Sequence, residues 1–258
     1  MTAFPGVTLL ITHYNRSASL GRLLASFKAL DCRFDDIVVA DDGSKPDQQE
    51  QLKQLQTLYN FNLVLSPKNM GFPHNFNKGQ DAVKTPLTLY VQEDFVPSPT
   101  FPAHFADAVQ FMNTDKSLDY IRFWSFYRYP TMRPVGKGFS ELVFSPWNMS
   151  HLKFFMYSDN PHLRRSNFFE KFGRYKEGLS GDVMEYKMAI SFLQNKGKGL
   201  FYDDHMALFE HVNSTDEPST MHRANWRQKK NPLLLFMRWG YLRFKWLRST
   251  WDMKFMRL

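Results

Sequence analysis

The chain has 258 residues, of which 43% are hydrophobic and 22% are charged, and this composition excludes an intrinsically disordered protein. Its single cysteine, Cys32, excludes an internal disulfide and a cysteine-based zinc site and is compatible with a reducing compartment. The net charge is +8, and residues 225–258 carry the whole excess, so a general polyanion-binding body is not expected. No apolar run approaches the roughly 18 residues that span a bilayer, and the N-terminal run is unlike a signal peptide, which predicts a cytoplasmic protein.

The first hundred residues alternate strand-like and helix-like segments. Residues 7–14 (VTLLITHY) predict a buried strand, and Ser17 then offers an N-cap to a helix. Residues 36–44 (DIVVADDGS) predict a second strand, followed by a helix that opens on a capping box of Ser44 and Asp47. Further strands are predicted at 61–66 and 87–92. This alternation predicts a parallel sheet covered by helices, with ligands beyond the carboxyl ends of the strands.

Three polar motifs follow these strands and are expected to meet at one edge of the sheet: THYNR at 12–16, DDGS at 41–44 and QEDF at 92–95. Asp41 and Asp42 suit a strand-to-helix turn, and alternatively a carboxylate here accepts a hydrogen bond from a nucleotide base or ribose. Glu93 and Asp94 suit a solvated strand end, and alternatively provide hard oxygen ligands for Mg²⁺ or Mn²⁺. The residues alone leave both alternatives open.

From residue 99 the pattern is mixed. A helix is predicted around Phe101 and Phe105, and DYIRFWSFYRYP at 119–130 is typical of a strand or of a substrate-binding wall. A further helix is predicted within LSGDVMEYKMAISFLQ, with Ser180 as its cap. FYDDHMALFEHV at 201–212 is predicted to be extended.

The order of these motifs resembles that of glycosyltransferase family 2, the inverting nucleotide-sugar enzymes of the GT-A type. VTLLITHYNR is similar to the family's opening strand and its T-x-Y-N-[RK] segment, and DIVVADDGSKPD to its second strand and DDGS turn. Residues 69–79 fit the pattern N-x-G-x5-N-x-G, and the following strand leads into a region similar to D-x-D-D. The resemblance implies an α/β fold: a mostly parallel, Rossmann-like nucleotide-binding sheet flanked by helices, with a mixed acceptor-binding part.

The resemblance also implies a donor site at the carboxyl edge of the sheet. Thr12, Tyr14 and Asp42 match the family positions that hold the uracil and ribose of a nucleotide sugar. The other residues expected to contact the nucleotide sugar are Asn15, Arg16, Asn69, Gly71, Asn77, Gln92 and Glu93.

A divalent cation, Mn²⁺ or Mg²⁺, is implied in the same way. Asp94 matches the second aspartate of D-x-D, and His211 matches a histidine that some GT-A enzymes use as a further metal ligand. The sequence departs from the family where Gln92 replaces the first aspartate and Phe95 replaces the acid after the motif. A neutral amide contributes less than a carboxylate to a dication, so this departure predicts weaker metal binding than in the family pattern.

The catalytic base implied by the resemblance is Asp182, with Glu185 one turn further on as its rival. The alternative interpretation, which needs no resemblance, is that Asp182 is an acid in the first turn of a helix that complements the helix dipole. Arg164 or Arg165 could add positive charge near the phosphates, and either one is equally well a surface residue. The implied mechanism is a single displacement at the anomeric carbon, which inverts its configuration.

Residues 225–258 form a basic and aromatic tail. Nine basic residues stand against one acid, Asp252, and alternate with rings such as Trp239, Phe244 and Trp251. This mixture fits a helix in a membrane interface that binds an anionic surface. Alternatively, the helix packs on the catalytic part with its basic residues solvated. Nucleic-acid binding is not expected, because no RNA- or DNA-binding motif accompanies the tail.

The leading hypothesis is a metal-dependent, inverting hexosyltransferase that moves a sugar from a UDP-linked donor to a hydroxyl of a lipid-linked or cell-surface glycan. It would be peripheral on the inner face of the plasma membrane. Residues 1–98 would bind the nucleotide sugar, 99–224 would bind the acceptor and carry catalysis, and 225–258 would associate with the membrane. Two alternatives are a non-catalytic nucleotide- or glycan-binding member of the family, favoured by Gln92 and Phe95, and a membrane-bound adaptor, favoured by the tail.

Overall fold

The computed structural model describes residues 2–212 and 232–256. The strands are β1 (Thr2–His13), β2 (Cys32–Asp41), β3 (Asn62–Leu65), β4 (Leu87–Gln92), β5 (Phe95–Pro97), β6 (Tyr120–Arg122), β7 (Met132–Gly136), β8 (Phe139–Leu142), β9 (His162–Arg165), β10 (Gly199–Tyr202) and β11 (Phe209–His211). The helices are α1 (Ser17–Ala29), α2 (Pro46–Tyr59), α3 (Phe72–Asp81), α4 (Phe101–Thr114), α5 (Phe168–Phe172), α6 (Gly181–Gln194) and α7 (Pro232–Phe255), with a 3₁₀ helix η1 (His151–Phe154).

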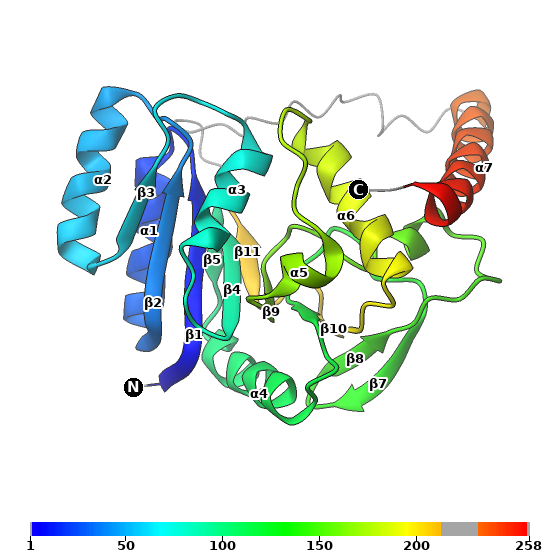
Figure 1. The fold of residues 1–258 in the computed structure, drawn as a ribbon. Helices are drawn as coiled ribbons and strands as arrows, with labels where there is room; N and C mark the ends of the chain where they lie inside the picture. The colour runs from blue at the N-terminus through cyan, green and yellow to red at the C-terminus, as the bar shows by residue number, and fades with distance from the viewer. Residues whose placement is uncertain (1, 213–231, 257–258) are drawn as a thin grey trace.

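A nine-stranded mixed sheet in the order β3-β2-β1-β4-β9-β6-β10-β8-β7 forms the centre of the molecule (Figure 1). β1 pairs in parallel with both β2 and β4, and β3 extends this parallel part at the edge. The α/β fold predicted for the first hundred residues is therefore confirmed. β1 begins at Thr2, earlier than the predicted strand, because Gly6 takes a φ of +75° and the register with β2 shifts between Phe4 and Thr8.

The second half of the sheet is mixed, as expected beyond residue 99. β9 runs antiparallel to both β4 and β6 and so joins the parallel part to the rest. β10 pairs in parallel with β6, and β8 and β7 follow as an antiparallel edge. A separate two-stranded sheet pairs β5 with β11, which brings His211 opposite Phe95. This pairing returns the chain to the end of β4 after more than a hundred residues.

The sheet separates two hydrophobic cores. Alternate residues of β1 point to opposite faces, so Leu9 and Ile11 join the core beneath α1 and α4, while Leu10 joins the core beneath α3, α5 and α6. Phenylalanine rings account for much of both cores, and Phe101 stacks on Phe105 with ring centroids 5.0 Å apart. The unusual aromatic content of the sequence therefore serves packing.

Gly79 allows α3 to lie close against the sheet. A Cβ at this position would stand 2.7 Å from Leu10 and 2.9 Å from Ala40, so no larger residue fits without a shift. The last glycine of the N-x-G-x5-N-x-G segment thus has a packing role. It lets the C-terminal part of α3 pack directly on β1 and β2.

The helix α7 packs on α6 and η1 at the far end of the sheet (Figure 1). Tyr186 of α6 donates its hydroxyl to Asp252 at 2.8 Å, and the ring of Trp246 covers the ammonium group of Lys153 at 4.9 Å. The structure therefore shows a helix docked on the body of the protein, while residues 225–231 and 257–258 of the predicted tail lie outside the described residues. Within the described ranges, every helix falls short of the length and apolar character that crossing a bilayer requires.

Candidate active site

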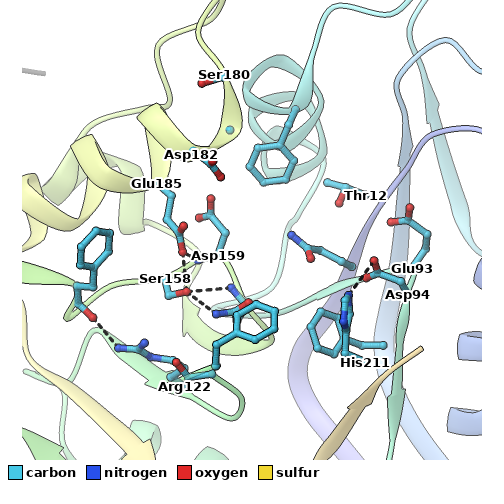
Figure 2. Close-up of a pocket in the computed structure, with 18 of the residues that line it drawn as sticks. Thr12, Glu93, Asp94, Arg122, Ser158, Asp159, Ser180, Asp182, Glu185 and His211 are labelled. Atoms are coloured by element: carbon cyan, nitrogen blue, oxygen red, sulfur yellow. Dashed lines mark hydrogen bonds and ion pairs between the residues drawn. The ribbon is translucent and has the colours of Figure 1, made fainter. Parts of the chain in front are cut away.

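A cavity of about 940 Å³ opens beyond the carboxyl ends of β1 and β4. One side, here called the strand wall, consists of lining residues from 12–16, 42, 69–72, 92–95 and 211. The opposite side, called the α6 wall, consists of lining residues from 122–129, 151–160 and 180–185. Figure 2 shows Thr12, Glu93, Asp94 and His211 facing Asp159, Asp182 and Glu185 across this space.

A buried network fixes the base of the strand wall. His13 Nδ1 lies 2.8 Å from Asp41 Oδ1, and the backbone N–H of Ser44 donates to Asp41 Oδ2 at 3.0 Å. Burial alone would raise the pKa of Asp41, but the hydrogen bonds from His13 and Ser44 hold it below its ordinary value. Asp41 is therefore engaged in turn structure, and its neighbour Asp42 is the acid that lines the cavity.

Asp42 holds the loop that leads into α3. Its two carboxylate oxygens accept the backbone N–H groups of Met70 and Gly71, each at 2.9 Å. Burial raises the pKa of Asp42, and these two backbone hydrogen bonds partly oppose the shift. Asp42 therefore lines the cavity itself and also positions Asn69 and Gly71 on the strand wall.

Asp94 lies at the end of β4 between a guanidinium and an imidazole. Its Oδ2 accepts from Arg16 Nη1 at 2.8 Å and lies 3.3 Å from His211 Nε2. Burial alone would raise the pKa of Asp94, but hydrogen bonds from His211 and Arg16 hold it below its ordinary value. Glu93 Oε1 lies 3.4 Å from the same Arg16 nitrogen, so one guanidinium bridges both acids.

The residues around Asp94 fit a divalent cation that shares its ligands with a substrate. Nowhere in 2–212 or 232–256 do three His, Cys, Asp or Glu side chains gather closely enough to hold a metal alone. Asp94 Oδ1, however, is buried and has no hydrogen-bond partner among the described residues, and His211 is adjacent. Mg²⁺ and Mn²⁺ are commonly held by one or two carboxylates plus substrate phosphates. Phe95 is 1% exposed and packs 4.9 Å from His211, so it orients this imidazole rather than adding a ligand.

On the α6 wall, two carboxylates differ in how they are held. Glu185 Oε1 accepts the hydroxyl of Ser158 at 2.6 Å and the backbone N–H of Asp159 at 3.1 Å. Asp182 is exposed at the first turn of α6, and within the described part of the chain its carboxylate makes no hydrogen bond or ion pair. Asp182 is therefore available to a proton on a bound molecule, whereas Glu185 is already oriented.

Asp159 is a third acid on this wall, and the sequence reasoning missed it. It is 7% exposed and accepts a hydrogen bond from the buried hydroxyl of Tyr175. Burial, with a smaller contribution from the charge of Glu185, raises the pKa of Asp159 to about 8. The signal available in the sequence was the turn-forming segment SDNP at 158–161, which names no chemistry by itself.

Four residues predicted for the site lie outside the cavity. Asn15 and Asn77 bond to the backbone, at Lys45 N–H and at the carbonyl of Tyr175 respectively. Arg164 and Arg165, which were expected near the phosphates, do not line this cavity. Arg164 is fully buried above the ring of Phe76 and donates to Gln80, and Arg165 donates to carbonyls at the end of α4.

All the other predicted residues line the cavity. They are Thr12, Tyr14, Arg16, Asp42, Asn69, Gly71, Gln92, Glu93, Asp94, Asp182, Glu185 and His211. Lining residues that the sequence reasoning did not single out include Phe72, Arg122, Arg128, Tyr129, His151 and Ser158. Most of these lie between β6 and β9, where the predicted pattern was least regular.

A protein-family model described as glycosyl transferase family 2 matches residues 8–167. Among solved structures, a fragment of S. aureus TarS in complex with UDP-GlcNAc superposes with a TM-score of 0.62 at 15% identity, covering 84% of this chain and 61% of that one. The mannosyltransferase PcManGT from Pyrobaculum calidifontis, in complex with GDP-Man and Mn²⁺, superposes with a TM-score of 0.57 at 14% identity. The match covers 81% of this chain and 57% of the PcManGT chain.

GalNAc-T7 with UDP, GalNAc and Mn²⁺ gives a TM-score of 0.59 at 14% identity, covering 92% of this chain and 49% of that one. At such identities the likeness shows the fold, which is that of GT-A glycosyltransferases. The chain spans about three fifths of the length of the TarS fragments it matches. A search of curated proteins returned no match.

Proposed function

Because the chain belongs to glycosyltransferase family 2 and has the GT-A fold, we propose that it is a glycosyltransferase that moves a sugar from a UDP-linked donor to an acceptor hydroxyl with inversion. One observation carries this proposal: a single cavity places Asp42 and Asp94 on one wall and Asp182 on the other. The nucleotide diphosphate would occupy the strand wall. The acceptor would enter along the α6 wall, so that the sugar is transferred between them.

The strand wall is suited to the donor. Thr12, Tyr14 and Asp42 would contact the base and ribose, and the 69–71 loop held by Asp42 would close over them. Arg16 offers a guanidinium to the diphosphate, since arginine pairs bidentately with phosphate oxygens. Asp94 and His211 would hold Mn²⁺ or Mg²⁺, which when bound neutralises charge on the departing diphosphate.

Asp182 is the better candidate for the base. An acceptor hydroxyl would lose its proton to Asp182 as its oxygen bonds to the anomeric carbon, while the bond from that carbon to the diphosphate breaks. Attack from the face opposite the diphosphate inverts the configuration in a single step. Glu185, already fixed by Ser158, would orient the acceptor. The exposed carboxylate of Asp182 supports this division of roles, because a base must reach the proton it removes.

We also propose that the acceptor is a lipid-linked or cell-surface glycan, met at the anionic inner face of the plasma membrane. Tyr241, Phe244, Trp251 and Phe255 lie on one stripe of α7, and each ring is more than half exposed. The sequence of the helix also contains five basic residues and a single acid, Asp252. Exposed rings beside cations suit an interface with anionic lipid.

The donor is tested by calorimetry with UDP, GDP and ADP in the presence of Mn²⁺, followed by assays of UDP release from a panel of UDP-sugars. We expect UDP to bind most tightly and one donor to turn over. If no nucleoside diphosphate binds, the proposed function is wrong.

A non-catalytic binding protein is the second candidate, and one observation favours it. The position of the last acid in the D-x-D-D region is occupied by Phe95, which is buried in the aromatic packing around Trp124. Such a protein would bind UDP yet release none from any donor, with acceptor or without it. The same two measurements therefore separate the candidates.

The membrane proposal is tested by sedimentation with vesicles of phosphatidylcholine alone or with phosphatidylglycerol. We expect binding only to the anionic vesicles, and loss of binding when Phe244 and Trp251 are both replaced by Ser. Leu58→Ser on α2 is the matched control, since Leu58 is similarly exposed at 60%. Equal binding to neutral vesicles, or no effect of the double substitution, would overturn it, and a membrane-bound adaptor would show vesicle binding without UDP release.

A further inference from the structure

Arg16 is anchored so that its guanidinium reaches the acids at the end of β4. It is the N-cap residue of α1, and its backbone N–H donates to His13 Nε2 at 3.2 Å. His13 is itself held by Asp41 in the buried network at the base of the strand wall. The side chain is therefore positioned by the fold and not by the two acids alone.

The guanidinium contacts the same carboxylate that a metal would use, through its other oxygen. Arg16 Nη1 lies 2.8 Å from Asp94 Oδ2 and 3.4 Å from Glu93 Oε1. All three side chains are largely buried, at 6%, 10% and 12% exposure for Arg16, Asp94 and Glu93. Like charges repel strongly where water is excluded, so a dication on Asp94 Oδ1 would meet the positive charge of Arg16 at close range.

A nucleotide diphosphate changes this balance. Its phosphate oxygens supply negative charge to both cations, one as a metal ligand and the other as a partner of the guanidinium. Arg16 can then leave Asp94 without losing an anionic partner. The two acids alone cannot satisfy both cations, because Gln92 replaces the acid that precedes Glu93 in the family pattern.

We propose that Arg16 acts as a resident cation that makes metal binding depend on the nucleotide. In the unliganded protein it holds Asp94 and Glu93, so a divalent ion binds weakly. When the diphosphate enters, Arg16 would turn to it and leave Asp94 and His211 to hold the metal. This inference rests on the proposed nucleotide-sugar site, and by linkage the metal must tighten the nucleotide by the same factor as the nucleotide tightens the metal.

The test measures Mn²⁺ binding to the unliganded protein by the electron paramagnetic resonance of free Mn²⁺. Arg16→Gln and Arg16→Met remove the charge, and the Met variant keeps much of the apolar stem. We expect both to bind Mn²⁺ at least about tenfold more tightly than the wild type. Arg128→Gln is the matched control, because Arg128 is also an arginine of the cavity but is exposed on the α6 wall. It should leave Mn²⁺ affinity unchanged.

A second measurement covers the case in which loss of Arg16 weakens the fold. Mn²⁺ alone should raise the melting temperature of the Arg16 variants more than that of the wild type, because at a given concentration an ion stabilises the folded state more the more tightly it binds. Calorimetry with UDP completes the test: Mn²⁺ should tighten UDP strongly in the wild type and less in the variants.

The outcomes separate this inference from the proposed function. If UDP fails to bind the wild type, with or without Mn²⁺, the nucleotide site itself is wrong. If UDP binds but the Arg16 variants take up Mn²⁺ no better than the wild type, the site stands and the role of Arg16 is wrong. A gain in Arg128→Gln as large as that in Arg16→Gln would also overturn the inference, since any arginine of the cavity would then have the same effect.

Discussion

The two walls of the cavity are built in different ways. The strand wall is formed at the ends of β1, β2 and β4, and its acids are already held by backbone N–H groups, by His211 or by Arg16. The α6 wall is formed by loops and one helix start, and it contains a carboxylate, Asp182, with no partner in the described part of the chain. A preorganised wall suits binding of a fixed group, and a wall with an available base suits chemistry.

The largest effect is expected from Asp182→Asn. Loss of a general base lowers turnover by roughly 10²–10⁴-fold, while UDP affinity should stay unchanged because Asp182 is on the α6 wall. Glu185→Gln should cost less, since the amide oxygen can still accept from Ser158. Rates of UDP release at saturating donor measure both. If turnover falls more in Glu185→Gln than in Asp182→Asn, then Glu185 is the base and Asp182 orients the acceptor.

Asp159→Asn should change how stability depends on pH. Burial raises the pKa of Asp159 to about 8, whereas in the unfolded chain it is near 3.9. Between these two pKa values the folded state keeps a proton that the unfolded state loses. Asp159 therefore lowers the free energy of unfolding as pH rises from about 4 to about 8, and its contribution is constant above that range. The Asp159→Asn variant has no proton to lose at this position, so it lacks this loss of stability. Its amide oxygen can still accept the hydrogen bond from the hydroxyl of Tyr175.

We expect the wild type to lose on the order of a few kcal/mol relative to Asp159→Asn between pH 4 and pH 8. Urea denaturation at pH 5, 6.5 and 8 measures the difference. Asp47→Asn, which removes an exposed carboxylate from α2, controls for the loss of one charge. Parallel pH profiles for the wild type and Asp159→Asn would show that Asp159 is ionised in the folded protein.

The strand wall could be predicted because its information is local. A strand, a polar turn and a helix follow one another directly in the chain, and parallel pairing brings the turns to one edge. Thr12, Asp42 and Asp94 therefore meet although they are far apart in the chain. His211 was reached only through the family resemblance, because its place depends on the pairing of β11 with β5.

The α6 wall was predicted less well for the opposite reason. Asp159 becomes a site residue through contacts with Tyr175 and Glu185, which no spacing in the sequence reveals. Arg164 was misplaced because its position in the order of motifs says nothing about which face of β9 it occupies, and that face is packed against the ring of Phe76. Asn15 and Asn77 fit the family pattern but stabilise turns.

Asp42→Asn tests how rigid the strand wall is. Because both oxygens of Asp42 accept backbone N–H groups, an amide would set its NH₂ against one of these donors. We expect a loss of about 1–3 kcal/mol in the free energy of unfolding, together with weaker UDP binding. Urea denaturation and calorimetry measure the two effects, again with Asp47→Asn as control. Weaker UDP binding at unchanged stability would mean that Asp42 contacts the nucleotide without holding the loop.

The smallest effect is expected from Tyr186→Phe, which tests whether the contact of α6 with α7 supports the α6 wall. The hydroxyl of Tyr186 contacts Ser249 at 2.9 Å and Asp252 at 2.8 Å, and these bonds tie α7 to α6. Their loss should cost about 1 kcal/mol and speed hydrogen exchange in α7 up to about tenfold, with α1 and α3 unchanged. Tyr127→Phe, at an exposed tyrosine, is the control.

If exchange also rises at the first turn of α6, then α7 supports the position of Asp182, and membrane binding through α7 could alter turnover. If exchange rises in α7 alone, the helix is an attachment whose docking leaves the base undisturbed. Faster exchange in α1 would contradict the separation of the two walls, because the strand wall should be independent of a hydroxyl on the far side of α6.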